Sequence, residues 1–259
     1  KSFVQPNKGK GSFISKLFKN AFKAEGNIPS FAKQEKSLKE LHPQTYKIVE
    51  KHAKRMGIPL TDEGFAEIIK LMNRIQLQES MGVLNHPDIS YEDTFKALDT
   101  PAGLTKAGPF QFDKEMLVTS FNRLKNEKLS PGLKELKEVI ASPDYNKKKP
   151  VGEKKDGPTI AHRNHWRAVT EFRLTPDDLM MLTASNAFAA KDTDRHIKAV
   201  LAGEGFKDLG DGKTHGQQIY LKGHWRGTDK SPMADEIIES SKTFFGSREG
   251  LEKRIGEDI

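Results

Sequence analysis

The sequence predicts a mainly α-helical protein: a helical N-terminal domain followed by a C-terminal winged-helix-like domain with a small β-hairpin. Apolar residues recur at helical spacing through most of the chain, helix-start signals precede several of these runs, and a glycine-rich segment over 210–216 interrupts the helical period. The chain has 259 residues and no cysteine. The absence of cysteine excludes disulfide frameworks, thiolate zinc sites and cysteine nucleophiles. No run approaches the ~20 apolar residues of a membrane-spanning helix.

The positive charge is concentrated at the N-terminus. Residues 1–60 hold 13 Lys and Arg against 4 Glu, a net charge of +9, whereas residues 61–259 carry a net charge of −2. Residues 1–28 are predicted to form a basic amphipathic arm with Lys16, Lys19 and Lys23 beside an apolar face. The arm could contact nucleic acid, lie on an anionic membrane surface through residues 12–24, or dock on the protein, which we favour.

Residues 29–142 are predicted to form the helical domain. Thr61 is a candidate cap for its longest helix, and Asp113 and the Ser130–Pro131 pair begin two later helices. Helices are predicted over 31–41, 44–56, 61–81, 90–98, 113–128 and 130–142. The next segment, 143–158, reads PDYNKKKPVGEKKDGP and has almost nothing to bury, so it is predicted to be a solvated linker.

The second domain, residues 159–228, is predicted to contain three helices and a hairpin. The first helix is predicted over 160–172. The start of the second is marked by Thr175, Pro176 and Asp178. The third follows Asp192 or Thr193 and stops at Gly203 or Gly205. Strands are predicted over 206–209 and 217–221. This order is that of a winged helix, whose third helix enters the major groove. Residues 229–259 add two helices that pack back on the protein or contact a protein partner.

The segment RHIKAVLAGEGFKDLGDGKTHGQQIYL, with its basic helix, Gly-Phe exit and glycine-bearing hairpin, resembles a known module. It is similar to the winged helix near the C-terminus of phage and plasmid primase–helicases and virulence-associated E-type proteins. The resemblance implies duplex binding and a phage or mobile-element origin. It covers residues 159–228, about a quarter of the chain, and no helicase or primase motif accompanies it in residues 1–150.

The function we expect is non-catalytic binding of nucleic acid, most simply DNA, by a soluble protein acting inside cells. Arginine reads guanine with paired donors, lysine pairs mainly with phosphate, and an aromatic ring stacks on bases. The candidate contacts in the winged helix are Arg195, His196, Lys198, Lys207, Lys213, His215, Lys222, Trp225 and Arg226. Lys16, Lys19 and Lys23 are expected to add phosphate affinity.

Two other functions stay open. A nuclease or transferase-type effector or toxin could use His162, His215 or His224, although the required His/Glu geometry cannot be read from sequence. A structural or virion component, or a protein bound to membrane surfaces, is the third class. We predict no catalytic residue, metal site or cofactor.

Overall fold

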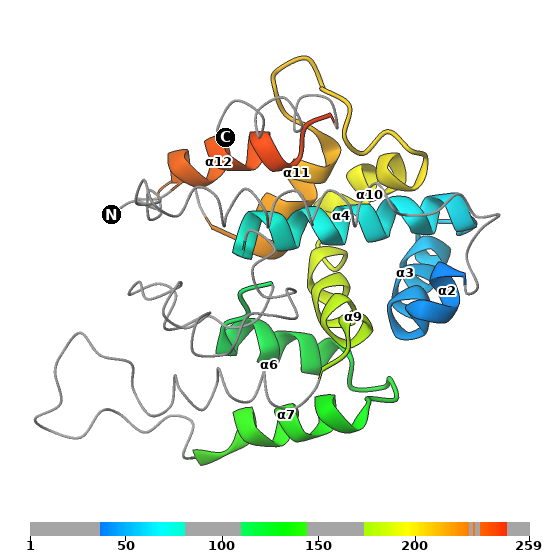
Figure 1. The fold of residues 1–259 in the computed structure, drawn as a ribbon, viewed down its shortest axis with the longest axis vertical. Helices are drawn as coiled ribbons and strands as arrows, with labels where there is room; N and C mark the ends of the chain where they lie inside the picture. Colours follow the sequence, from blue (N-terminus) through cyan, green and yellow to red (C-terminus); the bar gives the residue numbers. More distant parts are fainter. Residues whose placement is uncertain (1–36, 81–109, 144–173, 228–229, 231–233, 248–259) are drawn as a thin grey trace, which may run out of the picture.

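The computed structural model describes residues 37–80, 110–143, 174–227, 230 and 234–247. As predicted, these residues are mainly helical (Figure 1). The helices are α2 (Leu38–Leu41), α3 (Pro43–Arg55), α4 (Asp62–Ser80), α6 (Lys114–Arg123), α7 (Pro131–Ala141), α9 (Pro176–Ala187), α10 (Asp194–Leu201), α11 (His215–Ile219) and α12 (Ala234–Phe244), with a 3₁₀ turn η5 (Lys191–Thr193) and a π-helix η6 (Tyr220–Trp225). No helix within these residues is long and apolar enough to cross a membrane.

The helix starts read from the sequence are confirmed by side-chain caps. Thr61, Asp113, Ser130 and Thr175 each accept a hydrogen bond from the backbone N–H three residues later, which satisfies a donor that the first helical turn leaves unpaired. The helix predicted over 113–128 is shorter, because α6 ends at Arg123. The helices predicted over 90–98 and 160–172, and the second of the two predicted within 229–259, lie outside the described residues.

Helix α9 occupies the centre of the molecule. Every residue from Asp177 to Ala187 is buried, and the helix packs against α3, α6, η6 and α4. Asp177 reaches the start of α3, where its carboxylate accepts hydrogen bonds from the backbone N–H groups of Gln44 (3.0 Å) and Thr45 (2.9 Å). Since His42 makes no side-chain cap of its own, Asp177 caps α3 from a helix over 130 positions away.

The described helices share one hydrophobic core, which runs from Leu38 in α2 to Phe245 after α12. In Figure 1, α4 lies between α10, α11 and α12 on one side and α9, α6 and α7 on the other. The sequence predicted two domains joined at 143–158. The packing of α9 against both α3 and α6 brings residues from each side of that segment into the same core. Residues 144–158 themselves lie outside the description.

The C-terminal segment differs from the predicted hairpin. Residues 217–221, predicted as the second strand, belong to α11 and η6, and the segment 206–214 forms a loop with one isolated antiparallel bridge between Asp208 and Thr214. Within the described residues this bridge is the only β pairing of the segment. The predicted stop of α10 is confirmed, because Gly203 follows it with a left-handed φ of +79°.

The buried positions explain why this segment is helical. Gly216, Ile219, Tyr220 and Gly223 are buried, and their spacing of three or four residues is the period of a helix. Thr214 caps α11 by accepting from the N–H of Gln217, and its hydroxyl donates to the carbonyl of Phe245 at 2.7 Å. Over five residues, an alternating pattern cannot be told from such a helical one by sequence alone.

We expect the Asp177→Asn substitution to lower the free energy of unfolding by about 1–3 kcal/mol, the range for hydrogen bonds to a charged group in a buried setting. Urea unfolding followed by circular dichroism measures the loss. The matched control is Asp62→Asn in the first turn of α4, where the carboxylate is exposed and its loss should cost less than about 1 kcal/mol. Equal losses for the two variants would contradict the capping role.

Candidate functional site

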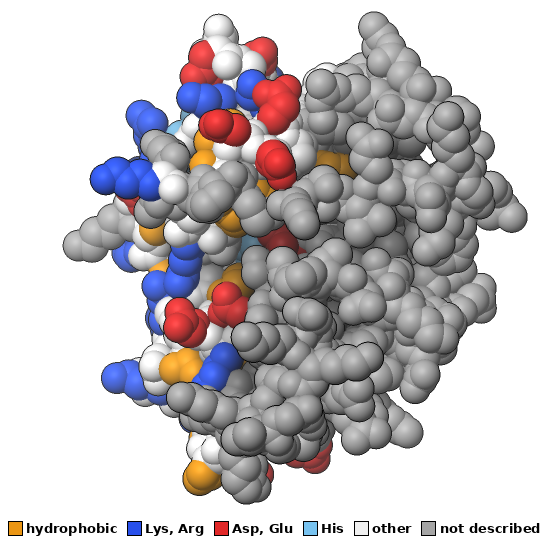
Figure 2. Space-filling model, turned by 90° about the vertical axis from the view of Figure 1, so that its left-hand side faces the viewer, with side chains coloured by type: hydrophobic (Ala, Val, Ile, Leu, Met, Phe, Trp, Pro, Cys, Tyr) orange, Lys and Arg blue, Asp and Glu red, His pale blue; other side chains and the backbone are white. Residues whose placement is uncertain are grey.

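The predicted cations of α10 lie on the surface. Arg195 and Lys198, three positions apart, are both exposed, and within the described part of the chain neither makes an ion pair with a carboxylate. Lys222 of η6 is also exposed, but its Nζ lies 3.5 Å from a carboxylate oxygen of Asp192. Figure 2 shows Lys and Arg side chains spread along the described part of one face, with Asp and Glu side chains among them.

The two predicted lysines of the loop after α10 each lie within ion-pair distance of a carboxylate. Lys207 pairs with Glu204 at 3.2 Å, and Lys213 lies 3.5 Å from Asp211. Lys16, Lys19 and Lys23 lie outside the described residues. Of the predicted lysines and arginines that are described, Arg195, Lys198 and Arg226 are exposed without a carboxylate partner among the described residues, and Arg195 and Lys198 are the two that share a helix.

His196 is buried, with 1% of its surface exposed, so its imidazole does not face solvent beside Arg195 and Lys198. Its Nδ1 lies 2.8 Å from Nδ1 of His215, and its Nε2 accepts a hydrogen bond from Nε of Arg195 at 3.2 Å. Accepting at Nε2 leaves the proton of the neutral ring on Nδ1, which then donates to His215. The two predicted histidines, His196 buried and His215 half-buried, thus form a pair that joins α10 to α11.

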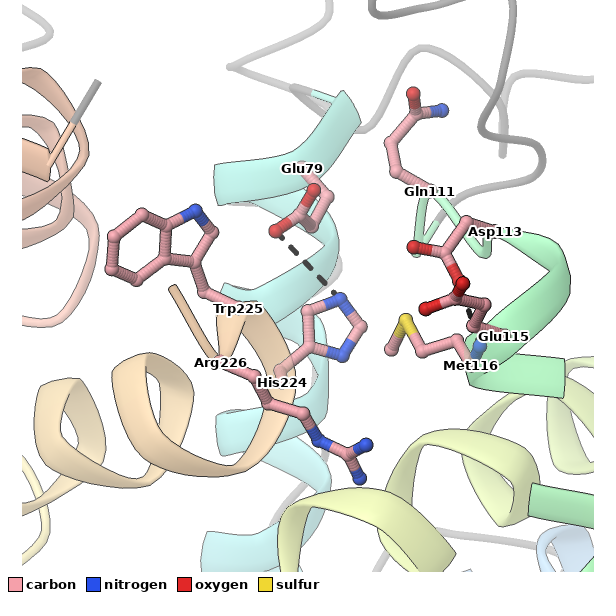
Figure 3. A pocket seen from close by; sticks show the side chains of 8 residues that line it. All are labelled: Glu79, Gln111, Asp113, Glu115, Met116, His224, Trp225 and Arg226. Carbon is pink, nitrogen blue, oxygen red and sulfur yellow. Dashed lines mark hydrogen bonds and ion pairs between the residues drawn. The ribbon is translucent and has the colours of Figure 1, made fainter. Parts of the chain in front are cut away.

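The end of η6 carries a second group of polar side chains, in a cavity of about 230 Å³. Its walls come from the end of α4, the end of η6 and the residues that begin α6 (Figure 3). The lining residues are Glu79, Gln111, Asp113, Glu115, Met116, His224, Trp225 and Arg226. Trp225 and Arg226 were predicted as nucleic-acid contacts and His224 as a possible catalytic histidine.

Glu79, in the last turn of α4, is held in place by η6. Its side chain is only 11% exposed, and its Oε1 accepts a hydrogen bond from the hydroxyl of Tyr220 at 2.8 Å. Burial, followed by the nearby charge of Glu79, raises the pKa of Tyr220 well above 10, so the hydroxyl keeps its proton and remains a donor. Nε2 of His224 lies 3.7 Å from the same carboxylate oxygen.

His224 also connects η6 to the opposite wall. Its Nε2 is 3.0 Å from the carbonyl oxygen of Phe110, and because a carbonyl only accepts, this nitrogen carries the ring proton. Beyond Phe110, Gln111 has a φ of +50°, and Asp113 caps α6 by accepting from the N–H of Met116 at 2.7 Å. Asp113 and Glu115 face His224 across the cavity in Figure 3.

The backbone around the cavity is unusual in three places. Gln111 and Arg226 are the two described non-glycine residues with a left-handed φ, and both line this cavity. The π-helix η6 ends there as well. Strained backbone and π-helical turns are found preferentially at functional sites, where the surrounding packing holds them in place.

Sequence reasoning missed Glu79, Gln111, Asp113 and Glu115 as site residues. A signal for Glu79 was present, since it follows Ile68, Met72 and Ile75 at helical spacing and so places a carboxylate on the buried face of α4. A charged residue at such a position is rarely tolerated unless it is paired or functional. Asp113 was identified only as a helix cap, and nothing in the local sequence indicates that it faces Glu79.

Comparison of the chain with protein-family models, curated proteins and solved structures found no match. Within the described residues, no three His, Cys, Asp or Glu side chains are grouped so that they could hold a metal ion.

Acid is expected to destabilise the protein through its buried histidines. Burial, then the charges of Arg195, His215 and Lys222, lowers the pKa of His196 to about 4, and burial is also the main cause that lowers the pKa of His52 to about 4. The unfolded chain binds these protons near pH 6.5, so the stabilisation is complete above pH 6.5 and is lost as the pH falls toward 4. Each imidazole should contribute about 1–2 kcal/mol to the loss between pH 7.5 and 5.

Urea unfolding at several pH values checks this. The His196→Gln variant should lose part of the pH dependence between 6.5 and 4, whereas the exposed control Lys198→Gln should keep all of it. An unchanged slope in the His196→Gln variant would show that protonation of His196 does not contribute to the loss of stability.

Proposed function

We propose that this protein cleaves glycosidic bonds, with Glu79 as the general acid. The observation that carries the proposal is the carboxyl of Glu79, 11% exposed at a polar cavity and held by Tyr220, with Asp113 and Glu115 on the facing wall. Cleavage of a glycosidic bond requires a proton donor for the leaving oxygen and, in most such enzymes, a second carboxylate for the developing positive charge or the attacking water.

Tyr220 fixes the side chain of Glu79, which acts as the proton donor when its carboxyl is protonated. The hydroxyl of Tyr220 donates to Oε1, which fixes the plane of the carboxyl, and the N–H of His224 is directed at the carbonyl of Phe110. A catalytic acid whose position is fixed before the substrate binds avoids the entropic cost of ordering it during the reaction. In the proposed step, the protonated carboxyl of Glu79 gives its proton to the glycosidic oxygen as the bond from that oxygen to the anomeric carbon breaks. A water molecule, or a hydroxyl of the same sugar, forms the new bond to that carbon, and its proton passes to a carboxylate of the cavity.

The facing wall suits the role of the second carboxylate. Asp113 is anchored by its bond to the N–H of Met116, and Glu115 follows it in the first turn of α6. Side chains with oxygen and nitrogen atoms form most of the lining, and a saccharide presents hydroxyl groups that can both donate to and accept from them.

The first test is cleavage of purified polysaccharides. Wild-type protein should release new reducing or anhydro ends from at least one member of a panel of chitin, peptidoglycan, cellulose and polygalacturonate, as measured by mass spectrometry. The Glu79→Gln variant should lose activity by about 10²-fold or more, because the amide cannot donate its proton to the leaving oxygen.

Glu67→Gln is the matched control, because Glu67 lies on the same helix, pairs with Lys70 and is outside the cavity. It should retain full activity. Activity that survives the Glu79→Gln substitution, or wild-type protein that cleaves none of the four polymers, would contradict the proposal.

We further propose, as a second function, that the surface of α10 binds nucleic acid. The observation that favours it is the exposure of Arg195 and Lys198 on one helix, without carboxylate partners among the described residues. The resemblance of residues 159–228 to a winged helix and the +9 charge of residues 1–60 support the same function. In this proposal the loop 206–214, closed by the Asp208–Thr214 bridge, takes the position of the wing.

The double substitution Arg195→Ala, Lys198→Ala should weaken binding to duplex DNA and reduce the slope of log K against log salt by about 2, one for each lost phosphate contact. Fluorescence anisotropy over a salt series measures both quantities. The control Lys51→Ala, Lys54→Ala removes the same charge at the same spacing from α3, where both lysines are paired with glutamates. The same loss in both double variants would show that only net charge matters.

A further inference from the structure

Two arginines, of which Arg226 lines the cavity, converge on one amide oxygen. Nη1 of Arg123, at the end of α6, donates to Oδ1 of Asn186 at 2.9 Å, and Nη2 of Arg226 donates to the same oxygen at 2.8 Å. Both arginines are exposed, and within the described residues neither makes an ion pair with a carboxylate. Like charges this close destabilise one another unless an anion is shared between them.

Asn186 is fixed so that its oxygen faces the arginines. The side chain is buried, and its Nδ2 hydrogen-bonds to the hydroxyl of Ser120 and lies 3.4 Å from the carbonyl of Met116. Because the amide nitrogen is directed at these acceptors in α6, the oxygen must point the other way. The two guanidinium groups are therefore held together before any ligand arrives.

Part of this arrangement serves the fold. Arg123 also donates to the backbone carbonyls of Ser185 and Asn186 in the last turn of α9, and Nε of Arg226 donates to the carbonyl of Gly223. The negative end of the α9 dipole attracts such cations. Each guanidinium, however, has five N–H donors. In Arg123 these bonds occupy Nη1. In Arg226 they occupy Nε and one proton of Nη2. Among the described residues, no contact uses Nε and Nη2 of Arg123 or Nη1 of Arg226, so these groups can meet a ligand.

We propose that Arg123 and Arg226 form a binding site for a carboxylate group on the molecule that occupies the cavity. Arg226 lines the cavity, so an acidic substituent of a bound saccharide can reach the pair while the rest of the sugar faces Glu79. Guanidinium groups recognise carboxylates through short, charge-assisted hydrogen bonds. This choice of substrate rests on the proposed glycosidic cleavage, but the anion site itself does not require Glu79 to be catalytic.

The carboxylates that line the cavity favour a bound anion with one negative charge over an anion with two. Asp113 and Glu115 line the same cavity as Arg226, and their charges repel an incoming anion in proportion to its own charge. A carboxylate therefore suits the site better than a phosphate dianion.

The test follows the Nε resonances of arginine side chains by NMR in the full-length protein, with acetate, phosphate and chloride added at matched ionic strength. Acetate should shift the resonances of Arg123 and Arg226 saturably in the millimolar range, and chloride should not. Arg55, an exposed arginine paired with Asp194, is the internal control and should not shift. In the Arg226→Gln variant, the affinity of Arg123 for acetate should fall about tenfold or more, as expected when a charge-assisted hydrogen bond is lost.

Three outcomes would overturn the proposal. The absence of a saturable shift, or equal shifts at Arg55, would show that the pair is no site. A saturable shift with phosphate alone would show that the site takes a phosphate group. Because the readout uses free anions, these results do not depend on whether Glu79 cleaves a polysaccharide.

Discussion

Helix α9 buries every residue from Asp177 to Ala187, so each polar side chain on it must find its partner inside the protein. Asp177 meets this requirement at the start of α3, and Asn186 meets it against α6 and the two arginines. These partners come from segments far apart in the sequence. The burial of one helix therefore specifies which neighbours surround it, and it joins the two halves of the chain into one core.

The same helix places the cavity. A Cβ atom added at Gly223 would lie 2.5 Å from the carbonyl oxygen of Ala187, so η6 can approach the end of α9 this closely only because residue 223 is a glycine. That approach sets Tyr220 and His224 against Glu79, and it sets Arg226 beside Asn186. The acidic and basic parts of the cavity thus depend on one packing contact.

Local signals in the sequence predicted the helices well. Thr61, Asp113, Ser130 and Thr175 each cap the helix they were expected to begin, because a cap is made within four residues of chain. The strand predicted over 217–221 was wrong, because these residues are helical. Their short pattern fits the period of a strand and that of a helix, and the burial of Tyr220 in the fold decides for the helix. The cavity could not be predicted, because the wall formed by η6 is separated from the other two by more than a hundred residues of chain. Glu79 alone had a local signal, as a carboxylate on an apolar helix face.

The most direct measurement of the central claim is a crystal structure of the Glu79→Gln variant with an oligosaccharide taken from a polymer that the wild-type protein cleaves. The account predicts a glycosidic oxygen within about 3 Å of the side-chain amide of residue 79, the reach of a proton-donating group. Asp113 or Glu115 should face the same sugar from the other wall. An oligosaccharide bound away from this cavity, or one whose glycosidic oxygen lies nearest to another acidic group, would contradict the claim.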